Sequence, residues 1–220
     1  MKNKKTLLQA KQDLLNKMQA DIIQVDNMLP YKKNAVLVPL VENGEGLGVL
    51  FEVRAKHLAW QPGEICFPGG RVEAEDLNYC CTAIRECCEE LALVDQDIEV
   101  LGALDPITSP LGLEVYPYLG MIAELDKIVP SEDEVAEVFV VPLSFLYQNE
   151  PRIAKLEVAT RPSPKTEFPY DLLPGHPTGW NIRNNYELRF YDYHGYIIWG
   201  ITAHILFNFL EKYKDVLKEQ

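Results

Sequence analysis

The sequence reads FPGGR at positions 67–71 and TAIRECCEEL at positions 82–91. The two glycines, Gly69 and Gly70, let a phosphate-bearing ligand approach the backbone closely, because neither carries a Cβ atom. The second segment continues a helical pattern that begins at about residue 77. One arc of this pattern is apolar and holds Leu77, Cys80, Cys81, Ile84, Cys87, Cys88 and Leu91, and the opposite arc holds Arg85, Glu86, Glu89 and Glu90. The pattern predicts a helix that packs on a core and presents three carboxylates together.

Three carboxylates on one helix face need compensation. Like charges about 4 Å apart repel by about 1 kcal/mol in water and by about 4 kcal/mol at a partly shielded site. Arg85 alone cannot offset this repulsion, whereas a bound divalent cation can. A solvated acidic helix face is the alternative explanation. The glycine loop before the helix and the nearly unbroken apolar arc favour the metal site, which needs rigidly held ligands.

The composition excludes some classes of partner. Of 220 residues, 47% are apolar, which is enough for a sizeable core, and no repeat or linker divides the chain, so we expect one domain over 1–220. The 33 acidic and 21 basic residues give a net charge of −12, which argues against nucleic acid or an anionic membrane as the partner. A phosphorylated small molecule stays compatible, because a divalent cation reverses the local field.

The chain has five crowded cysteines, Cys66, Cys80, Cys81, Cys87 and Cys88, an odd number that does not suit a disulfide framework. They lack zinc-knuckle spacing, and we interpret them as small apolar residues of a protein in a reducing compartment, the cytoplasm. The N-terminus predicts a charged helical extension over 1–33 without an export signal. The most apolar stretch, 196–210, is too short and too polar to span a bilayer and is expected to form a C-terminal core helix.

Strand-like runs dominate the rest of the sequence. Two of them, 35–40 and 47–54, flank the turn residues 43–46 and predict a hairpin. Further strands are expected at 98–104, 115–124, 137–141, 153–158 and 186–191, which together with the helices predict an α/β fold with a mixed sheet. Five prolines between residues 160 and 181 exclude regular structure there. Two interpretations of this loop stay open, a lid or binding loop and a solvated insertion.

Together these residues resemble the Nudix box, a family pattern that ends in Arg-Glu-apolar-any-Glu-Glu-any-Gly-apolar. Residues 85–93 fit it except for Ala92, where the family has Gly. Upstream, Asp76 stands in place of a Glu, and eight residues rather than seven separate it from Arg85. The Asp at this position and the extra residue before Arg85 resemble the coenzyme A pyrophosphatase branch of the family.

A second signature of that branch lies within 50–67, where the matching residues are Arg54, Leu58, Gly63, Glu64 and Phe67. Two positions depart from it: Ala55 replaces a Ser, and Ala59 replaces a basic residue. The resemblance covers about residues 34–210. It implies a Nudix-type α/β/α sandwich with a mixed β-sheet and a C-terminal helix.

The resemblance also implies roles for the residues of the site. Glu86 and Glu90 would be the principal ligands of Mg²⁺ or Mn²⁺, with Glu89 as a further ligand, direct or through water. Arg85 would orient Glu89, its i+4 neighbour. The candidate general base is Glu134, in the loop 131–134. The substrate phosphates are expected at Arg54 and Arg71, with close backbone approach at Gly69 and Gly70.

The implied function is metal-dependent hydrolysis of coenzyme A or acyl-coenzyme A to adenosine 3′,5′-bisphosphate and a phosphopantetheine. The departures at Ala55 and Ala59 favour an alternative within the family, hydrolysis of ADP-ribose, a dinucleotide or a nucleotide sugar. A third hypothesis is a catalytically silent nucleotide-binding module, against which the retention of all three box glutamates argues. The expected partner is a small nucleoside diphosphate derivative, and homodimerisation is left open.

Overall fold

The computed structural model describes residues 31–44 and 46–217, all of which belong to one compact unit, Tyr31–Gln220. The predicted N-terminal helical extension lies outside the described residues, apart from its end. There, Lys32 and Lys33 begin the first strand, β1 (Lys32–Glu42), so the extension does not reach residue 33 as a helix. The prediction of one domain over 1–220 therefore stays a prediction.

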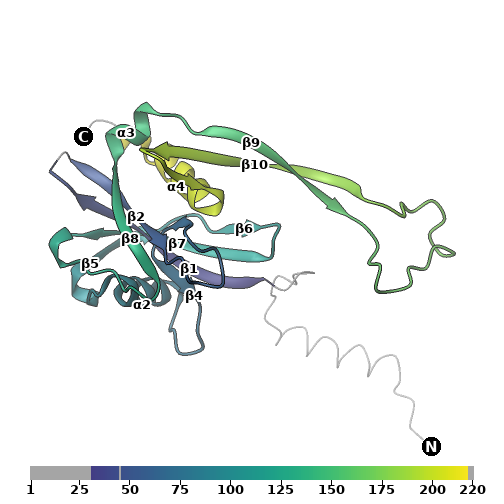
Figure 1. The fold of residues 1–220 in the computed structure, drawn as a ribbon, viewed down its shortest axis with the longest axis horizontal. Coiled ribbons are helices and arrows are strands. Elements are labelled where there is room, and N and C mark those ends of the chain that lie inside the picture. The colour runs from purple at the N-terminus through teal and green to yellow at the C-terminus, as the bar shows by residue number, and fades with distance from the viewer. Residues whose placement is uncertain (1–30, 45, 218–220) are drawn as a thin grey trace, which may run out of the picture. The chain divides into compact units, whose positions relative to one another are not determined.

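A hairpin of β1 and β2 (Leu47–Arg54) forms the centre of the sheet, as predicted (Figure 1). Its two strands pair only near the turn, from Leu40 opposite Val49 to Glu42 opposite Leu47. Beyond that point β1 pairs with β4 (Gly69–Arg71), and β2 pairs with β3 (Ile65–Cys66). The glycine segment is therefore inserted between two strands that have separated, in the middle of the sheet.

The sheet is mixed because β1 also pairs in parallel with β7 (Leu113–Ile122), while its other pairings are antiparallel. Strand β8 (Val135–Pro142) pairs with β2, and both β5 (Ile98–Ala103) and β6 (Ile107–Ser109) pair with β7. Two short 3₁₀ helices lie next to these strands in the chain: Asp95–Asp97 precedes β5, and Leu125–Lys127 follows β7. Strands expected at 98–104, 115–124 and 137–141 are thereby confirmed.

Helices cover both faces of this sheet, because its strands alternate between two cores. On β1, Leu37 packs with Leu91 of helix α2 (Tyr79–Leu91), whereas the neighbouring Val38 packs with Phe209 of helix α4 (Gly200–Lys212). The short helix α3 (Leu143–Gln148) joins the second core, and α5 (Lys214–Leu217) follows α4. The α/β/α sandwich with a mixed sheet and a C-terminal helix is thus confirmed.

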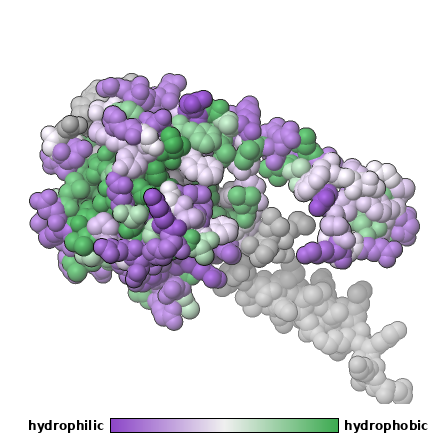
Figure 2. All heavy atoms as spheres, in the orientation of Figure 1, coloured by the Kyte–Doolittle hydropathy of each residue, from purple (hydrophilic) through white to green (hydrophobic). Residues whose placement is uncertain are grey.

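A second sheet of three strands has the order β11-β10-β9. Strand β9 (Arg152–Thr160) and strand β10 (Asn181–Tyr193) form a long hairpin, and residues 161–180 at its tip contain neither helix nor strand, as the prolines predicted (Figure 1). Figure 2 shows this tip mainly in hydrophilic and neutral colours.

The predicted C-terminal helix over 196–210 was wrong at its start. Residues Tyr196–Trp199 form strand β11, which pairs with β10 through a tight turn at His194 and Gly195. Both turn residues have positive φ, 52° and 94°, as a two-residue hairpin turn requires. The helix begins only at Gly200. Among the described residues, no helix is both long and apolar enough to cross a membrane.

Candidate functional site

Helix α2 carries the Nudix-like residues, and each of its ends is defined by local chemistry. At the start, the Asn78 side chain accepts a hydrogen bond of 3.0 Å from the Cys81 backbone N–H, a typical N-cap. At the end, Ala92 adopts the left-handed conformation, with φ 52° and ψ 40°. A glycine adopts this conformation without steric cost, whereas an L-residue costs about 1–2 kcal/mol. The departure at Ala92 therefore leaves the helix end intact but strained.

The buried face of α2 differs from the predicted apolar arc. Its buried residues are Thr82, Ala83, Cys87, Glu90 and Leu91, whereas Leu77 precedes the helix and is 90% exposed. Ala83, Cys87 and Glu90 follow one another at spacings of four and three, so they share one stripe. Glu90 therefore faces the sheet, whereas the prediction placed it on the arc opposite the apolar residues.

The cysteines are all free, and the described residues contain no disulfide framework, as predicted. Cys87 is buried beside the sheet, and the other four are partly buried. Burial raises the pKa of the Cys87 thiol, with the nearby carboxylate of Glu52 as a smaller cause. The Cys87 thiol therefore acts as a small apolar side chain, whereas Cys88 Sγ donates a hydrogen bond of 3.7 Å to Asp95 Oδ1.

Arg85 ties the preceding loop to the helix through Asp76. Its Nε lies 3.1 Å from Asp76 Oδ1 and its Nη2 lies 3.2 Å from Asp76 Oδ2, a two-point pair. Asp76 Oδ2 also accepts from Thr82 Oγ1 at 2.8 Å and from the Glu73 N–H at 2.9 Å. The hydrogen bond from Arg85 is the main reason why the pKa of Asp76 lies well below its usual range. Asp76, which stands where the family pattern has a Glu, thus fixes the Arg85 side chain in place.

Arg85 also contacts two glutamates of its own helix. Its Nη1 lies 3.2 Å from Glu89 Oε2, the i+4 pair that was expected, and its Nη2 lies 2.9 Å from Glu86 Oε1. The Glu89 side chain is 61% exposed, and Glu86 is mostly shielded. Burial raises the pKa of Glu86, and Arg85 opposes this shift. Arg85 therefore restrains the side chains of Glu86 and Glu89 at once.

The two glycines of the inserted segment make room for the protein's own atoms. The Gly69 N–H donates a hydrogen bond of 2.8 Å to Glu90 Oε2. A Cβ atom on Gly69 would lie 2.4 Å from the Ala35 carbonyl oxygen, and one on Gly70 would lie 2.3 Å from the Glu86 carboxyl carbon. The groups that lie against these glycines in the structure are β1 and the carboxylates of α2, and the close approach of a substrate phosphate to them stays a prediction.

Glu52, on β2, is a site residue that the sequence reasoning did not assign. It is 1% exposed, its side chain forms a hydrogen bond with that of Glu90, and its Oε1 has no hydrogen-bond partner within the described residues. Burial, followed by the charge of Glu90, raises the pKa of Glu52 well above its ordinary value. The available signal was a carboxylate in the middle of an apolar strand, where an unpaired charge is costly.

Glu90 is the centre of a cluster of acids. Burial raises its pKa to about 8, the Gly69 N–H opposes this shift, and the charges of Glu86 and Glu134 add to it. Arg54 lowers the pKa of both Glu52 and Glu90, so it is a compensating cation for this cluster. The structure therefore brings together four carboxylates and one arginine, a group we call the carboxylate cluster: Glu52, Glu86, Glu90, Glu134 and Arg54.

The loop 131–134 reaches the carboxylate cluster through main-chain hydrogen bonds. The Ser131 N–H donates to the Glu90 carbonyl at 2.8 Å, and the Ala55 N–H donates to the Glu134 carbonyl at 2.8 Å. The side chain of Glu134 is exposed. Arg71 lies at the end of β4 with an exposed side chain, and its carbonyl accepts from Arg85 Nη2 at 3.3 Å. Arg54 and Arg71 are the two predicted phosphate contacts. Of these, Arg54 acts electrostatically on Glu52 and Glu90.

The donor chemistry of the cluster fits a hard divalent cation. All its ligand atoms are carboxylate oxygens, burial and mutual repulsion raise the pKa values of three of its acids, and one buried oxygen has no partner. Within residues 31–44 and 46–217, no group of three or more His, Cys, Asp or Glu side chains is placed so that it could hold a metal ion as it stands. Glu86 is paired with Arg85, and Glu90 with Gly69. Cation binding would thus require these side chains to reorient.

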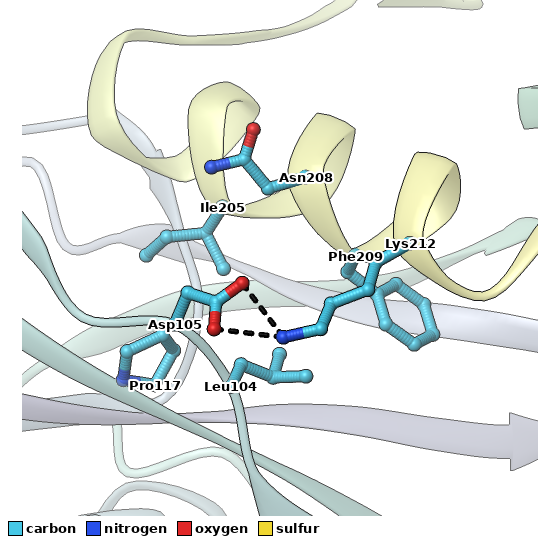
Figure 3. A pocket seen from close by; sticks show the side chains of 7 residues that line it. All are labelled: Leu104, Asp105, Pro117, Ile205, Asn208, Phe209 and Lys212. Atoms are coloured by element: carbon cyan, nitrogen blue, oxygen red, sulfur yellow. Dashed lines mark hydrogen bonds and ion pairs between the residues drawn. The ribbon is translucent and has the colours of Figure 1, made fainter.

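A small cavity elsewhere does not serve as a substrate site (Figure 3). Its volume is about 10 Å³, roughly the space of one water molecule. Lys212 Nζ closes it by pairing with both carboxylate oxygens of Asp105 at 2.7 Å, beside the apolar Leu104 and Phe209. This ion pair attaches α4 to the segment between β5 and β6.

The sequence of the chain is similar to known Nudix proteins. A family model described as the NUDIX domain matches residues 31–158. The chain is 33% identical over 180 residues to the uncharacterized Nudix hydrolase NudL of Enterobacter sp. (strain 638), covering 82% of each chain. It is 34% identical over 178 residues to the protein of the same description from Salmonella paratyphi B, covering 81% of each.

Among solved structures, a MutT/nudix family protein from Enterococcus faecalis is similar, with 18% identity and a TM-score of 0.48, over 97% of this chain and 71% of that one. The domain model spans more than half of the 220 residues, and the relatives match over four fifths of the chain. Members of the matched family generally use divalent metal cations. On this evidence the chain belongs to the Nudix family and is a pyrophosphohydrolase.

Proposed function

We propose that the protein hydrolyses the diphosphate bond of coenzyme A or acyl-coenzyme A, releasing adenosine 3′,5′-bisphosphate and a phosphopantetheine. The observation that carries the hydrolytic part is the carboxylate cluster, in which Glu52, Glu86 and Glu90 have raised pKa values and Arg54 opposes the charge. Such a site is short of positive charge, and a metal-bound diphosphate would bring both the cation and its ligand oxygens.

The substrate assignment is supported by the fold of the second signature, residues 54–67. The Arg54 N–H donates to the Glu64 carbonyl at 2.9 Å, and the Gly63 N–H donates to the Arg54 carbonyl at 3.0 Å. The signature thus closes a tight loop at the end of β2, beside the carboxylate cluster. Arg54 Nε in turn donates to the Trp60 carbonyl at 3.4 Å.

In the proposed mechanism Glu86 and Glu90 would hold Mg²⁺ or Mn²⁺, with Glu89 as a further ligand, direct or through water. A bound cation would supply positive charge to the diphosphate oxygens and would favour ionisation of a water molecule. Glu134 takes a proton from the attacking water, a new P–O bond forms, and the bridging P–O bond breaks. Arg85 positions Glu86 and Glu89, and Arg54 and Arg71 contact the phosphates.

Hydrolysis of ADP-ribose, a dinucleotide or a nucleotide sugar is the second candidate. It was favoured by the departures at Ala55 and Ala59, and the structure separates these two positions. Ala55 is 3% exposed and its N–H binds the Glu134 carbonyl, so it is a packing residue. Ala59 is exposed in the loop. The observation that favours the alternative is therefore the missing positive charge at Ala59.

The test is incubation of the purified protein and Mg²⁺ with coenzyme A, acetyl-coenzyme A, ADP-ribose and NADH, followed by chromatography of the products. We expect cleavage of the coenzyme A compounds to adenosine 3′,5′-bisphosphate. Much faster cleavage of ADP-ribose would overturn the substrate assignment. In parallel, Glu86→Gln is expected to lower kcat by about 10–100-fold. Its matched control is Glu99→Gln, an exposed position on β5, with unchanged activity.

A further inference from the structure

A cleft of about 530 Å³ lies between the main sheet and the three-stranded sheet, in the range of small-molecule sites. Its apolar lining comes from both sheets and consists of Val53, Ile65, Phe190, Tyr196, Ile197 and Trp199. Several of these side chains are partly solvent-exposed, including Trp199, at 37%, and Ile197, at 43%. Large apolar side chains are thus available to a ligand in the cleft.

Strand pairing connects this cleft to the carboxylate cluster. Glu137, Val53 and Ile65 lie opposite one another across β8, β2 and β3, and all three line the cleft. Glu52 occupies the neighbouring row on β2, and its side chain points to the other face because strand residues alternate. Gly63 and Glu64, which bind the Arg54 backbone, also line the cleft. The Arg54 backbone therefore joins the strand that carries Glu52 to two residues of the cleft lining.

The charge of the cleft decides which chemical group it accepts. Its lining contains two carboxylates and neither Lys nor Arg. Glu64 accepts a hydrogen bond of 3.0 Å from Gln61 Nε2, and Glu137 accepts one from the Tyr196 hydroxyl. A phosphate group would be repelled here, whereas an uncharged group with apolar surface and N–H or O–H donors would be complementary.

We propose that this cleft binds the uncharged, amide-bearing arm of the substrate, pantetheine or its acyl thioester, while the diphosphate lies at Arg54 and the carboxylate cluster. This inference rests on the proposed function for the position of the diphosphate. The other end of coenzyme A, adenosine with a 3′-phosphate, carries negative charge and does not suit Glu64 and Glu137. The arm is neutral, has amide N–H and hydroxyl donors for these carboxylates, and has methyl groups for Ile197 and Trp199.

The test uses two probes that are not hydrolysed, pantetheine and adenosine 3′,5′-bisphosphate, with binding to the full chain measured by calorimetry. Ile197→Ala is expected to weaken pantetheine binding by about tenfold, the effect of removing one or two methylene-sized contacts, without changing bisphosphate binding. Trp199→Ala is expected to act in the same direction. The matched control is Ile153→Ala, on β9 of the same sheet, where the side chain is 57% exposed and outside the cleft.

Several results would overturn the proposal. These are no binding of pantetheine by the wild type, equal pantetheine binding by wild type and Ile197→Ala, or a larger effect of Ile197→Ala on the bisphosphate. Thermal melting of each variant separates a local effect from unfolding. The outcome is distinct from that of the proposed function: cleft binding of pantetheine without hydrolysis of coenzyme A would contradict the proposed reaction alone, and hydrolysis with unchanged pantetheine binding would contradict the cleft alone.

Discussion

The two faces of the main sheet are built from the same strands but carry opposite chemistry. Towards α2, β2 contributes Leu50 and Glu52, and the buried Glu52 contacts Glu90. Towards α4, the same strand contributes Val49, Phe51 and Val53, which pack in an apolar core. A single alternating strand thus separates buried carboxylates from neutral apolar surface. Under the two proposals above, the sheet would hold the metal-dependent reaction on one side and the uncharged group of the substrate on the other.

The largest expected effect comes from moving one carboxylate on the acidic face. In Gly70→Ala the new Cβ would lie 2.3 Å from the Glu86 carboxyl carbon, so the Glu86 side chain must shift. We expect kcat to fall by about 100-fold, as for a displaced catalytic group, with little change in thermal stability, because a flexible side-chain end gives way.

The matched control is Gly179→Ala, where a Cβ would have no atom within 4 Å and φ is not positive. Steady-state kinetics and thermal melting check both variants. Full activity of Gly70→Ala would show that the position of Glu86 is not required.

The pH dependence of stability would distinguish the acidic face from the apolar one. The pKa of Glu90 rises from an ordinary value of 4.5 to about 8 in the folded chain, mainly through burial. The folded state therefore holds this proton more tightly than the unfolded state. Its stabilising contribution is complete below about pH 4.5 and is lost as the pH rises through about 8. In a metal-free sample with chelator, the Tm should fall by several degrees between pH 5 and pH 8.5.

Glu90→Gln serves as the comparison, because it cannot titrate. Its Tm should vary less over the same pH range, and Mg²⁺ should raise the wild-type Tm at pH 8.5. An equal pH dependence in wild type and Glu90→Gln would assign the effect to other groups.

Replacing the buried Glu52 of the acidic face with an apolar residue should raise the free energy of unfolding. Glu52→Leu removes a buried carboxyl group whose Oε1 has no partner among the described residues. The expected gain in the free energy of unfolding is about 1–3 kcal/mol, the usual cost of an unsatisfied buried polar group. Urea denaturation measures it. Glu99→Leu, at an exposed position on β5, should change stability by less than about 0.5 kcal/mol. Destabilisation by Glu52→Leu would mean that the hydrogen bond between Glu52 and Glu90 stabilises the fold by more than the unpaired Oε1 costs.

The smallest effect is expected at the end of α2, which carries the acids of this face. Ala92 has a φ of 52°, so Ala92→Gly should relieve strain and raise the free energy of unfolding by about 1 kcal/mol. Ala83→Gly, within the same helix, should have the opposite sign, because glycine lowers helix stability by about 1 kcal/mol and buried contacts are lost. Chemical denaturation of both variants checks the pair, and a loss of stability in Ala92→Gly would contradict the explanation.

Local spacing was enough to predict the hairpin of β1 and β2, the box helix, and the pair of Arg85 with Glu89. These features depend on residues close together in the chain, whose geometry follows from the period of a helix or strand. The prediction of a helix over 196–199 was wrong because an apolar run fits either period, and the turn at His194 and Gly195 selected a strand that needed β10 as its partner.

The burial of Glu90 and the role of Glu52 could not be obtained from spacing. Glu90 is buried because α2 packs on β1 through the stripe of Ala83 and Cys87, a rotation of the helix that depends on the sheet. Glu52 meets Glu90 because β1 and β2 separate and the segment 65–71 enters between them. Chain-local chemistry therefore identifies candidate residues for the reaction. Which carboxylates share a buried space, with raised pKa values, depends on contacts between residues that are far apart in the sequence.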